Sequence, residues 1–147
     1  MERFRGGYPA SIDAKGRLKL PARLKEQLDS GYGREVFVCS FFPWELRIFP
    51  LTVWESWEAR LDGLNTFDPV AMKVIELVNY GQQVEVDDQG RLLVPQLLRE
   101  TVEVDGEVVV SGRINHLAVT RRERAAKLLT SDSLSREELV TLARPER

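Results

Sequence analysis

Residues 12–26 read IDAKGRLKLPARLKE, and residues 86–100 read VDDQGRLLVPQLLRE. The two stretches align without a gap at an offset of 74 positions, and seven of the fifteen positions are identical. These are Asp13, Gly16, Arg17, Leu18, Pro21, Leu24 and Glu26, which recur as Asp87, Gly90, Arg91, Leu92, Pro95, Leu98 and Glu100. A repeat of this quality indicates that one structural unit occurs twice in the chain.

The similarity continues downstream of both stretches with small gaps. Residues 35–38 (EVFV) parallel residues 107–110 (EVVV), and residues 46–48 (LRI) parallel residues 117–119 (LAV). A unit of about 45–50 residues is marginal as an independent domain, so we expect the two units to share one core. This division predicts four segments: unit 1 (7–52), a helical linker (53–80), unit 2 (81–126) and a C-terminal helical or mobile tail (127–147).

Each unit predicts the same order of elements. The segments 14–16 and 88–90 are expected to form tight turns, because glycine adopts positive φ and a preceding aspartate can accept hydrogen bonds from turn amides. Residues 17–20 alternate between charged and apolar side chains, as in a half-buried strand. Pro21 and Pro95 suit the first position of a short helix. The unit is therefore a β-hairpin, a short helix and a second β-hairpin.

Apolar spacing also predicts the helices. Leu24 and Leu28, like Leu98 and Val102, lie four positions apart and give each short helix one apolar face. In the linker, Trp54, Trp57 and Leu61 have helical spacing, which favours packing in the core over a partner surface.

Helix boundaries are predicted from local signals. Asp68-Pro69 is a typical helix start, and residues 63–66 are expected to join the two linker helices. Residues 121–129 are expected to form a helix equivalent to the one after unit 1. Ser135 followed by Glu138 has the capping-box pattern and predicts a short final helix.

The net charge of the 147 residues is −2, and this average conceals an asymmetry. The first 25 residues contain seven basic and two acidic side chains, so this segment carries +5 and the remainder carries −7. Such a distribution favours a basic face that could meet phosphate, although a merely solvated surface is the alternative.

The composition also excludes several classes of site. The single cysteine, Cys39, rules out a disulfide framework and a cysteine-rich zinc site, and the single histidine, His116, argues against a His-based metal site or a Ser-His-Asp triad. Both are read as packing or surface residues, and the Asp87-Asp88 pair lacks a third ligand. We expect no enzyme activity, cofactor, metal or small-molecule substrate. Without a signal peptide or a long apolar run, we expect no membrane association and a cytoplasmic protein.

The motifs, taken in order, resemble those of the MraZ family over residues 4 to about 128. The matching segments are Phe4-Arg5-Gly6, Ser11–Leu18 with Pro21, Asp87–Arg91, Pro95 and Gly112–Asn115. The chain departs from the family pattern at Phe41–Trp44 and at His116–Thr120, which concerns subunit contacts more than the fold.

This resemblance implies a β-rich α+β fold: two AbrB-like (SpoVT-AbrB) swapped-hairpin units forming one pseudo-symmetric β-barrel with flanking helices. It also implies a nucleoid-associated bacterial transcriptional regulator that assembles as a ring-shaped homo-oligomer. Such proteins bind short direct repeats in double-stranded promoter DNA upstream of the division and cell-wall gene cluster, their own promoter included. The family's DNA contacts correspond here to Lys15 and Arg17.

The two copies of the turn motif differ in their surroundings. Lys15 and Arg17 lie among basic residues, whereas Arg91 lies among acidic ones. Arg17 could simply form an ion pair with Asp13, but its basic surroundings favour contact with DNA, with Arg5 and Lys19 as further candidates. The residues expected to hold the two turns are Asp13, Gly16, Asp87, Gly90 and Arg91. The alternative function is an AbrB-fold module for protein interaction or oligomerisation without DNA binding.

Overall fold

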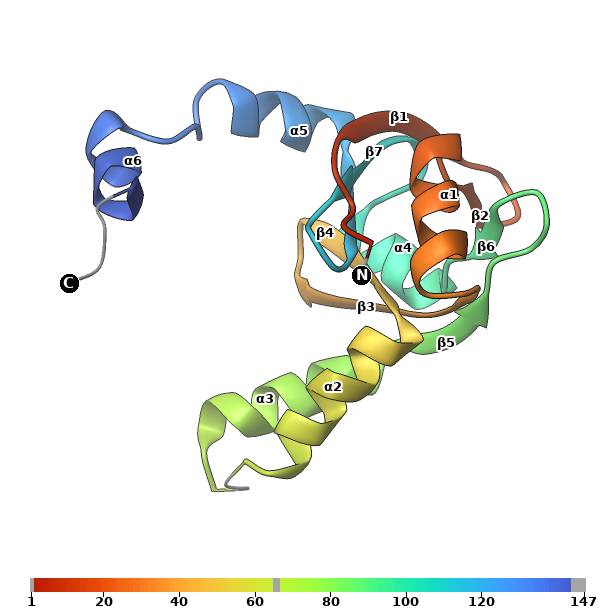
Figure 1. Ribbon diagram of the computed structural model, residues 1–147, viewed down its shortest axis with the longest axis horizontal. Coiled ribbons are helices and arrows are strands. Elements are labelled where there is room, and N and C mark those ends of the chain that lie inside the picture. Colours follow the sequence, from red (N-terminus) through yellow and green to blue (C-terminus); the bar gives the residue numbers. More distant parts are fainter. Residues whose placement is uncertain (1, 65–66, 144–147) are drawn as a thin grey trace.

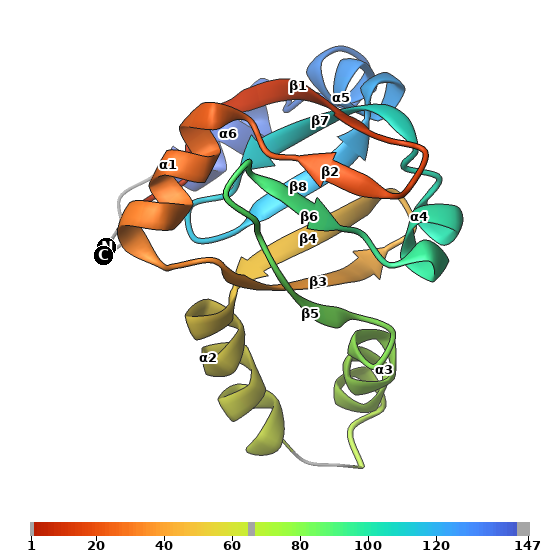
Figure 2. The ribbon, with the colours of Figure 1, turned by 90° about the vertical axis from the view of Figure 1, so that its right-hand side faces the viewer.

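The computed structural model describes residues 2–64 and 67–143, and eight antiparallel strands of these residues form one sheet (Figure 1). The order across the sheet is β5-β3-β4-β8-β7-β1-β2-β6. The strands are β1 (Gly7–Ile12), β2 (Arg17–Lys19), β3 (Glu35–Phe42), β4 (Glu45–Pro50), β5 (Gln82–Glu85), β6 (Arg91–Leu93), β7 (Gly106–Gly112) and β8 (Leu117–Arg121). The two ends of this order, β5 and β6, are consecutive in the chain, and Figure 2 shows the sheet curled into a nearly closed barrel.

The described residues also form six helices. They are α1 (Ala22–Gly31), α2 (Leu51–Asp62), α3 (Pro69–Val78), α4 (Gln96–Val102), α5 (Arg122–Leu129) and α6 (Arg136–Ala143). Helices α1 and α4 cover the barrel, α2 and α3 form a projecting pair, and α5 and α6 extend from the barrel as an arm (Figure 1). No helix in the described part of the chain is long and apolar enough to cross a membrane.

The first hairpin of each unit pairs with the other unit. Strand β1 pairs with β7 of the second unit, with Ala10 opposite Val108, and β5 pairs with β3 of the first unit, with Val36 opposite Val84. This is the swapped-hairpin arrangement of the expected fold. Four strand pairs, β1–β7, β2–β6, β3–β5 and β4–β8, join the two units, so strands of both units are needed to form the barrel.

An approximate two-fold axis runs through the centre of the β2–β6 pair. Leu18 lies opposite Leu92, and these are equivalent positions of the repeat. The flanking backbone bonds obey the same symmetry, because the amide of Leu20 donates to the carbonyl of Gly90 at 2.8 Å and the amide of Val94 donates to that of Gly16 at 2.9 Å. The sequence repeat is thus expressed as a structural symmetry of one barrel.

The barrel encloses the main core. Leu18 and Leu92 point inward, and Leu24 and Leu28 of α1 and Leu98 and Val102 of α4 are all buried, which confirms the predicted apolar helix faces. Burial of each such side chain contributes about 1.5–3 kcal/mol. Both units therefore contribute to one continuous core.

The linker helices pack differently from the prediction. Trp54 is 3% exposed and stacks on Phe37 with ring centroids 4.3 Å apart, so its expected place in the core is confirmed. The core prediction is wrong for Trp57, which is 38% exposed and lies under the guanidinium of Arg60. Helix α2 is buried only at its start, by Val53 and Trp54 against β3 and β4, and Trp57 lies one turn further along, where the helix projects from the barrel (Figure 1).

Helix starts agree closely with the sequence signals. Asp68 caps α3 by accepting hydrogen bonds from the amides of Val70 and Ala71, and Ser135 and Glu138 form the reciprocal capping box of α6. The helix expected at 121–129 begins one residue later, at Arg122. Asn65 and Thr66 of the expected linker turn, and residues 144–147 of the tail, lie outside the described residues.

The expected position of the two prolines needs a small correction. Pro21 and Pro95 stand immediately before the first helical residue, not within the helix, with ψ angles of 139° and 134°. Each proline therefore ends the extended segment after β2 or β6, while its fixed φ suits the turn into the helix.

Candidate nucleic-acid interface

The turn between β1 and β2 is organised around the carboxylate of Asp13. One carboxylate oxygen accepts hydrogen bonds from the amides of Lys15 (2.9 Å) and Arg17 (3.0 Å), and the amide of Gly16 donates to the carbonyl of Asp13 at 2.9 Å. Gly16 has a φ of +84°, which disfavours any residue with a side chain. These bonds, above all that from the Arg17 amide, lower the pKa of Asp13. The carboxylate thus stays charged and presents Lys15 and Arg17 on a defined backbone.

The turn between β5 and β6 repeats this backbone arrangement. The carboxylate of Asp87 accepts from the amides of Gln89 (2.9 Å) and Arg91 (2.8 Å), and Gly90 has a φ of +81°. The pKa of Asp87 is lowered, mainly by the bond from the Arg91 amide. In both turns, therefore, the aspartate, the glycine and the arginine amide form the same scaffold.

The side chains on this common scaffold differ. Arg17 forms an exposed ion pair with Asp13 (Nε to Oδ2, 3.1 Å), whereas the guanidinium of Arg91 donates to the side-chain oxygen of Gln89. An exposed pair of this kind contributes only about 0–1 kcal/mol to stability. It uses one of the five N–H donors of Arg17, so the others can still bind a phosphate or a base.

Each turn glycine is covered by a basic side chain from the other unit. A Cβ on Gly16 would come within 2.6 Å of the Arg99 guanidinium carbon, and a Cβ on Gly90 would come within 2.9 Å of Cδ of Lys25. Lys25 and Arg99 are equivalent positions of the repeat. Lys25 also forms an ion pair with Asp29 at 2.7 Å, so its ammonium group is bound to a carboxylate of the same helix, α1.

The outer face of the β2–β6 pair gathers positive charge from both units. Leu18 and Leu92 point into the barrel, so Arg17, Lys19 and Arg91 share the opposite face. Lys19 lies directly opposite Arg91 in the strand register, an arrangement that is unfavourable for like charges unless an anion lies nearby. Reasoning from neighbours in the sequence missed this pair; pairing the two repeats about Leu18 and Leu92 would have found it.

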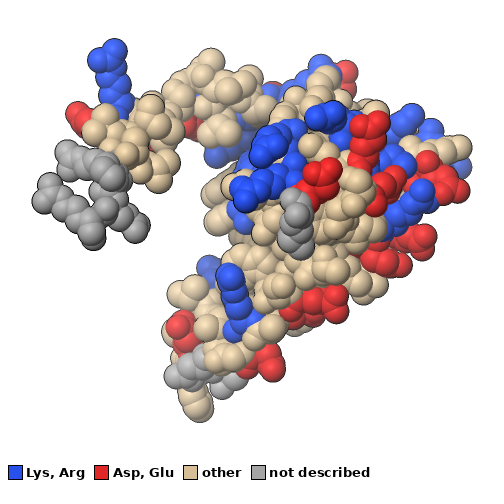
Figure 3. Space-filling model, in the orientation of Figure 1, with Lys and Arg blue, Asp and Glu red and all other residues tan. Residues whose placement is uncertain are grey.

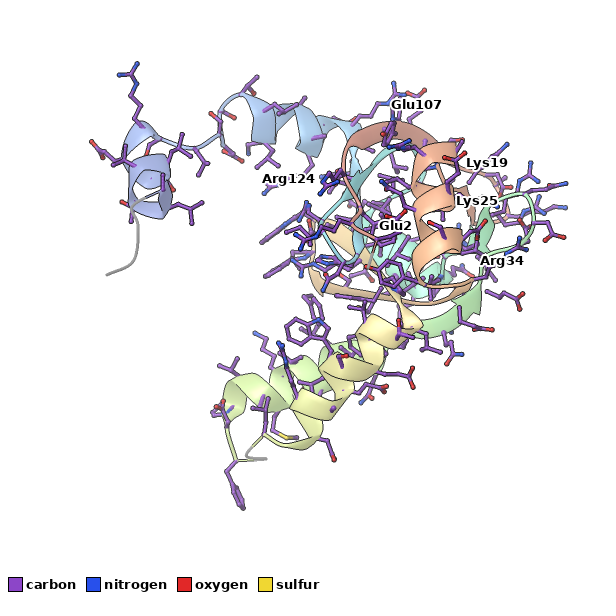
Figure 4. The ribbon with its side chains drawn as sticks, in the orientation of Figure 1. Glu2, Lys19, Lys25, Arg34, Glu107 and Arg124 are labelled. Carbon is purple, nitrogen blue, oxygen red and sulfur yellow. The ribbon has the colours of Figure 1, made fainter. Side chains whose placement is uncertain are left out.

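Lys19 lies beside α1 (Figure 4). It also borders a groove of about 410 Å³ that includes Pro21 and Ala22 at the start of this helix. The groove contains a second cation, Arg122, whose guanidinium lies 3.4 Å from the carboxylate of Glu107. The ammonium group of Lys19 has no ion-pair partner within the described residues. Arg122 is a neighbour of Lys19 that sequence reasoning did not identify, because the two are 103 positions apart.

Arg5 lies at the opposite end of β1 from the Lys15–Arg17 turn. A strand of six residues spans roughly 20 Å, so Arg5 is not part of the same local cluster. Instead it lines a groove with Arg3 and Arg23, together with the carboxylates of Glu2 and Asp29. Figure 3 shows basic side chains over β1 and the N-terminal side of the barrel, interspersed with acidic ones. The candidate cations thus form a turn cluster and a separate group near Arg5.

The single histidine and the single cysteine line neither of the two grooves that contain Lys19 and Arg5. Burial lowers the pKa of His116 to about 4 and raises the pKa of the Cys39 thiol to about 12, so both are neutral near pH 7. His116 stacks on Phe49 with ring centroids 4.7 Å apart. No group of three or more potential metal ligands of the His, Cys, Asp or Glu type exists among the residues that the structure describes.

Fold and site together define a class of protein: a doubled barrel of swapped hairpins, in which one turn presents two cations and its counterpart carries polar and acidic residues. The family described as "MraZ protein, putative antitoxin-like" matches residues 3–74 and 79–141. The chain therefore belongs to the MraZ family.

Relatives named "Transcriptional regulator MraZ" support this membership along nearly the whole chain. The proteins of Acidobacterium capsulatum and Koribacter versatilis are each 40% identical, over 141 and 142 residues, covering 95% of this chain and 97% of each relative. The protein of a Marinomonas species is 37% identical over 123 residues, covering 82% of this chain and 81% of its own.

Proposed function

We propose that the chain is a transcriptional regulator that recognises specific sequences in double-stranded promoter DNA. Family membership and the name of the relatives support regulation of transcription. The observation that supports DNA contact is the exposed Lys15–Arg17 turn, in which the Asp13 carboxylate accepts hydrogen bonds from two backbone amides. In this proposal Arg17 contacts a base or a phosphate, for which a guanidinium has bidentate geometry, and Lys15 contacts a phosphate.

The proposed target is a set of short direct repeats upstream of the division and cell-wall gene cluster, the protein's own promoter included. One subunit offers few phosphate contacts: Lys15, Arg17 and Lys19 at one end, and Arg5 at the other. Few contacts give weak binding at physiological salt, whereas a ring of subunits would engage several repeats at once and gain from effective concentration. We therefore propose a ring-shaped homo-oligomer associated with the nucleoid in the cytoplasm.

The division of labour between the segments forms part of this proposal. Unit 1 (7–52) contacts DNA, and unit 2 (81–126) completes the barrel, with Arg91 mainly holding its own turn. The linker (53–80) connects the two units, and the tail (127–147) serves in assembly. The alternative, an AbrB-fold interaction module without DNA binding, draws support from the exposed aromatic residues Phe42, Trp44 and Trp57.

A binding titration tests the proposal. A labelled duplex from just upstream of the protein's own gene is compared with a shuffled duplex, at about 50 and 200 mM salt. We expect preference for the upstream duplex, a steep loss of affinity with salt, and loss of the preference in Arg17→Ala. Arg60→Ala is the matched control, because Arg60 is an exposed arginine on α2, outside the turn. Equal binding of both duplexes, or normal binding by Arg17→Ala, would overturn the assigned site.

A further inference from the structure

The C-terminal arm presents an apolar helix that has no buried residue. In α6, Leu139 is 54% exposed and Leu142 is 80% exposed, and Val140 is exposed as well. The arm has defined local structure: Arg124 pairs with Asp132 at 3.4 Å, and the amide of Asp132 donates to the carbonyl of Lys127 at 2.9 Å. These contacts order the turn that follows α5, and α6 lies beyond it, away from the barrel (Figure 1). An exposed helix with apolar residues at i and i+3 is the form taken by segments that dock in grooves.

The same chain carries an apolar groove elsewhere. Its volume is about 490 Å³, and its lining comes from the β3–β4 turn, the end of α3 and one side of α4. The lining residues are Ser40, Phe41, Phe42, Pro43, Leu77, Tyr80, Leu97, Leu98 and Thr101. None of them is charged, and Tyr80 and Leu97 are more than half exposed. The groove is thus suited to an apolar segment rather than to DNA.

The charges around these two surfaces are complementary. At the aromatic end of the groove, Arg47 lies over the rings of Phe41 and Phe42. Arg47 and Arg113 share the single buried carboxylate of Glu45, at 3.0 and 3.3 Å, so this cluster keeps one positive charge in excess. Helix α6 carries Glu137 in its first turn, and that carboxylate has no ion-pair partner within the described residues. A helix lying in the groove with its first turn toward the aromatic end would place this carboxylate near the guanidinium group of Arg47.

Within one chain, α6 does not occupy the groove. Both ribbon views separate α6 from α3 and α4, and α5 is packed on β7 and β8 between them (Figures 1 and 2). We propose that α6 of one subunit docks in the groove of a second copy of this chain. The two surfaces differ, so the contact is heterologous, and its repetition closes a ring or extends a filament. This inference rests on the proposed assembly into a ring and names the surfaces that build it.

Two blocked variants test the contact. Leu139→Asp with Leu142→Asp removes the apolar surface of α6, and Tyr80→Asp with Leu97→Asp places charge in the groove. All four side chains are exposed, so we expect the barrel of both variants to fold. Leu64→Asp with Val70→Asp is the matched control at the exposed tip of the α2–α3 pair. Circular dichroism checks folding, and light scattering coupled to size exclusion measures the mass. A chain ending at Asp132 provides a second way to remove α6.

We expect the wild type and the control to be oligomers of several subunits and each blocked variant to be monomeric at the same concentration. A mixture of the two blocked variants should stop at a dimer, since it retains one intact groove and one intact α6. Oligomers in either blocked variant, or no dimer in the mixture, would overturn the inference, because assembly would then use surfaces other than α6 and the groove. A monomeric wild type would overturn it as well.

Binding to a duplex with a single repeat separates this inference from the proposed function. The blocked variants keep the Lys15–Arg17 turn, so their affinity for one repeat should equal that of the wild type within about threefold, while affinity for the full promoter falls through lost multivalency. Loss of single-repeat binding in wild type and variants alike would contradict the DNA proposal but not the contact between subunits.

Discussion

The turn between β1 and β2 and the turn between β5 and β6 have the same backbone and different side chains. In both turns, an aspartate accepts hydrogen bonds from two backbone amides, and a glycine has a φ above +80°. Between these shared positions, Ala14-Lys15 of the first turn is replaced by Asp88-Gln89 in the second. The repeated residues therefore build the turn, whereas the variable residues determine what the turn can contact.

The largest effect on DNA affinity is expected when the arginine of the first turn is replaced, and the arginine of the second turn provides the comparison. Arg17→Ala should weaken binding to the upstream duplex by about 10- to 100-fold, the equivalent of about 1–3 kcal/mol for a lost bidentate contact. Arg91→Ala should weaken it by about threefold or less, as expected for at most a peripheral charge opposite Lys19. Fluorescence anisotropy at fixed salt measures both. Equal losses would mean that both turns meet DNA.

The next effect concerns the backbone that the two turns share. Gly16→Ala and Gly90→Ala should each lower the free energy of unfolding by about 1–2 kcal/mol, since each forces a side chain into a left-handed conformation. Gly7→Ala is the control, because its Cβ would only reach ordinary contact with Ser111, at 3.7 Å. Urea denaturation gives the three values. If one glycine tolerates alanine as well as Gly7 does, the two turns are not equivalent scaffolds.

Exchange of the variable residues should convert the first turn into a copy of the second. Ala14→Asp with Lys15→Gln removes a cation and adds a carboxylate, so affinity for DNA should fall by about tenfold and the slope of log K against log salt should decrease by about one. The reciprocal exchange, Asp88→Ala with Gln89→Lys, is the matched change. It should raise affinity only slightly, and a large gain would show that the second turn also faces DNA.

The smallest effect is expected from the pH dependence of stability. The folded-state pKa values of Asp13 and Asp87 are lowered from 3.8, so their contribution to stability is present above the unfolded value and is lost as pH falls through the folded one. Asp13→Asn and Asp87→Asn should therefore each reduce the decrease in Tm between pH 7 and pH 3. Thermal scans at the two pH values measure this decrease, and an unchanged decrease in either variant would contradict the role of that carboxylate.

Local signals predicted much of the fold. The repeat, the alternation at residues 17–20 and the four-residue spacing of Leu24 and Leu28 depend only on neighbours in the chain, and the structure agrees with them. The cap at Asp68 and the capping box at Ser135 were predictable for the same reason. The exposure of Trp57 was not predictable in this way, because it depends on how far along α2 the contact with β3 and β4 extends.

For the candidate interface, the sequence alone identified the turn residues and the excess of basic side chains in the first 25 positions. Only the tertiary structure decided which cations share a surface: the β2–β6 register sets Lys19 against Arg91, α5 brings Arg122 to Lys19, and the length of β1 separates Arg5 from the turn. The physical reason is the distance along the sequence over which each kind of interaction acts. Turn geometry and helix capping arise from contacts within a few residues, whereas the pairing of strands 74 positions apart follows from closing the barrel around a core that neither unit forms alone.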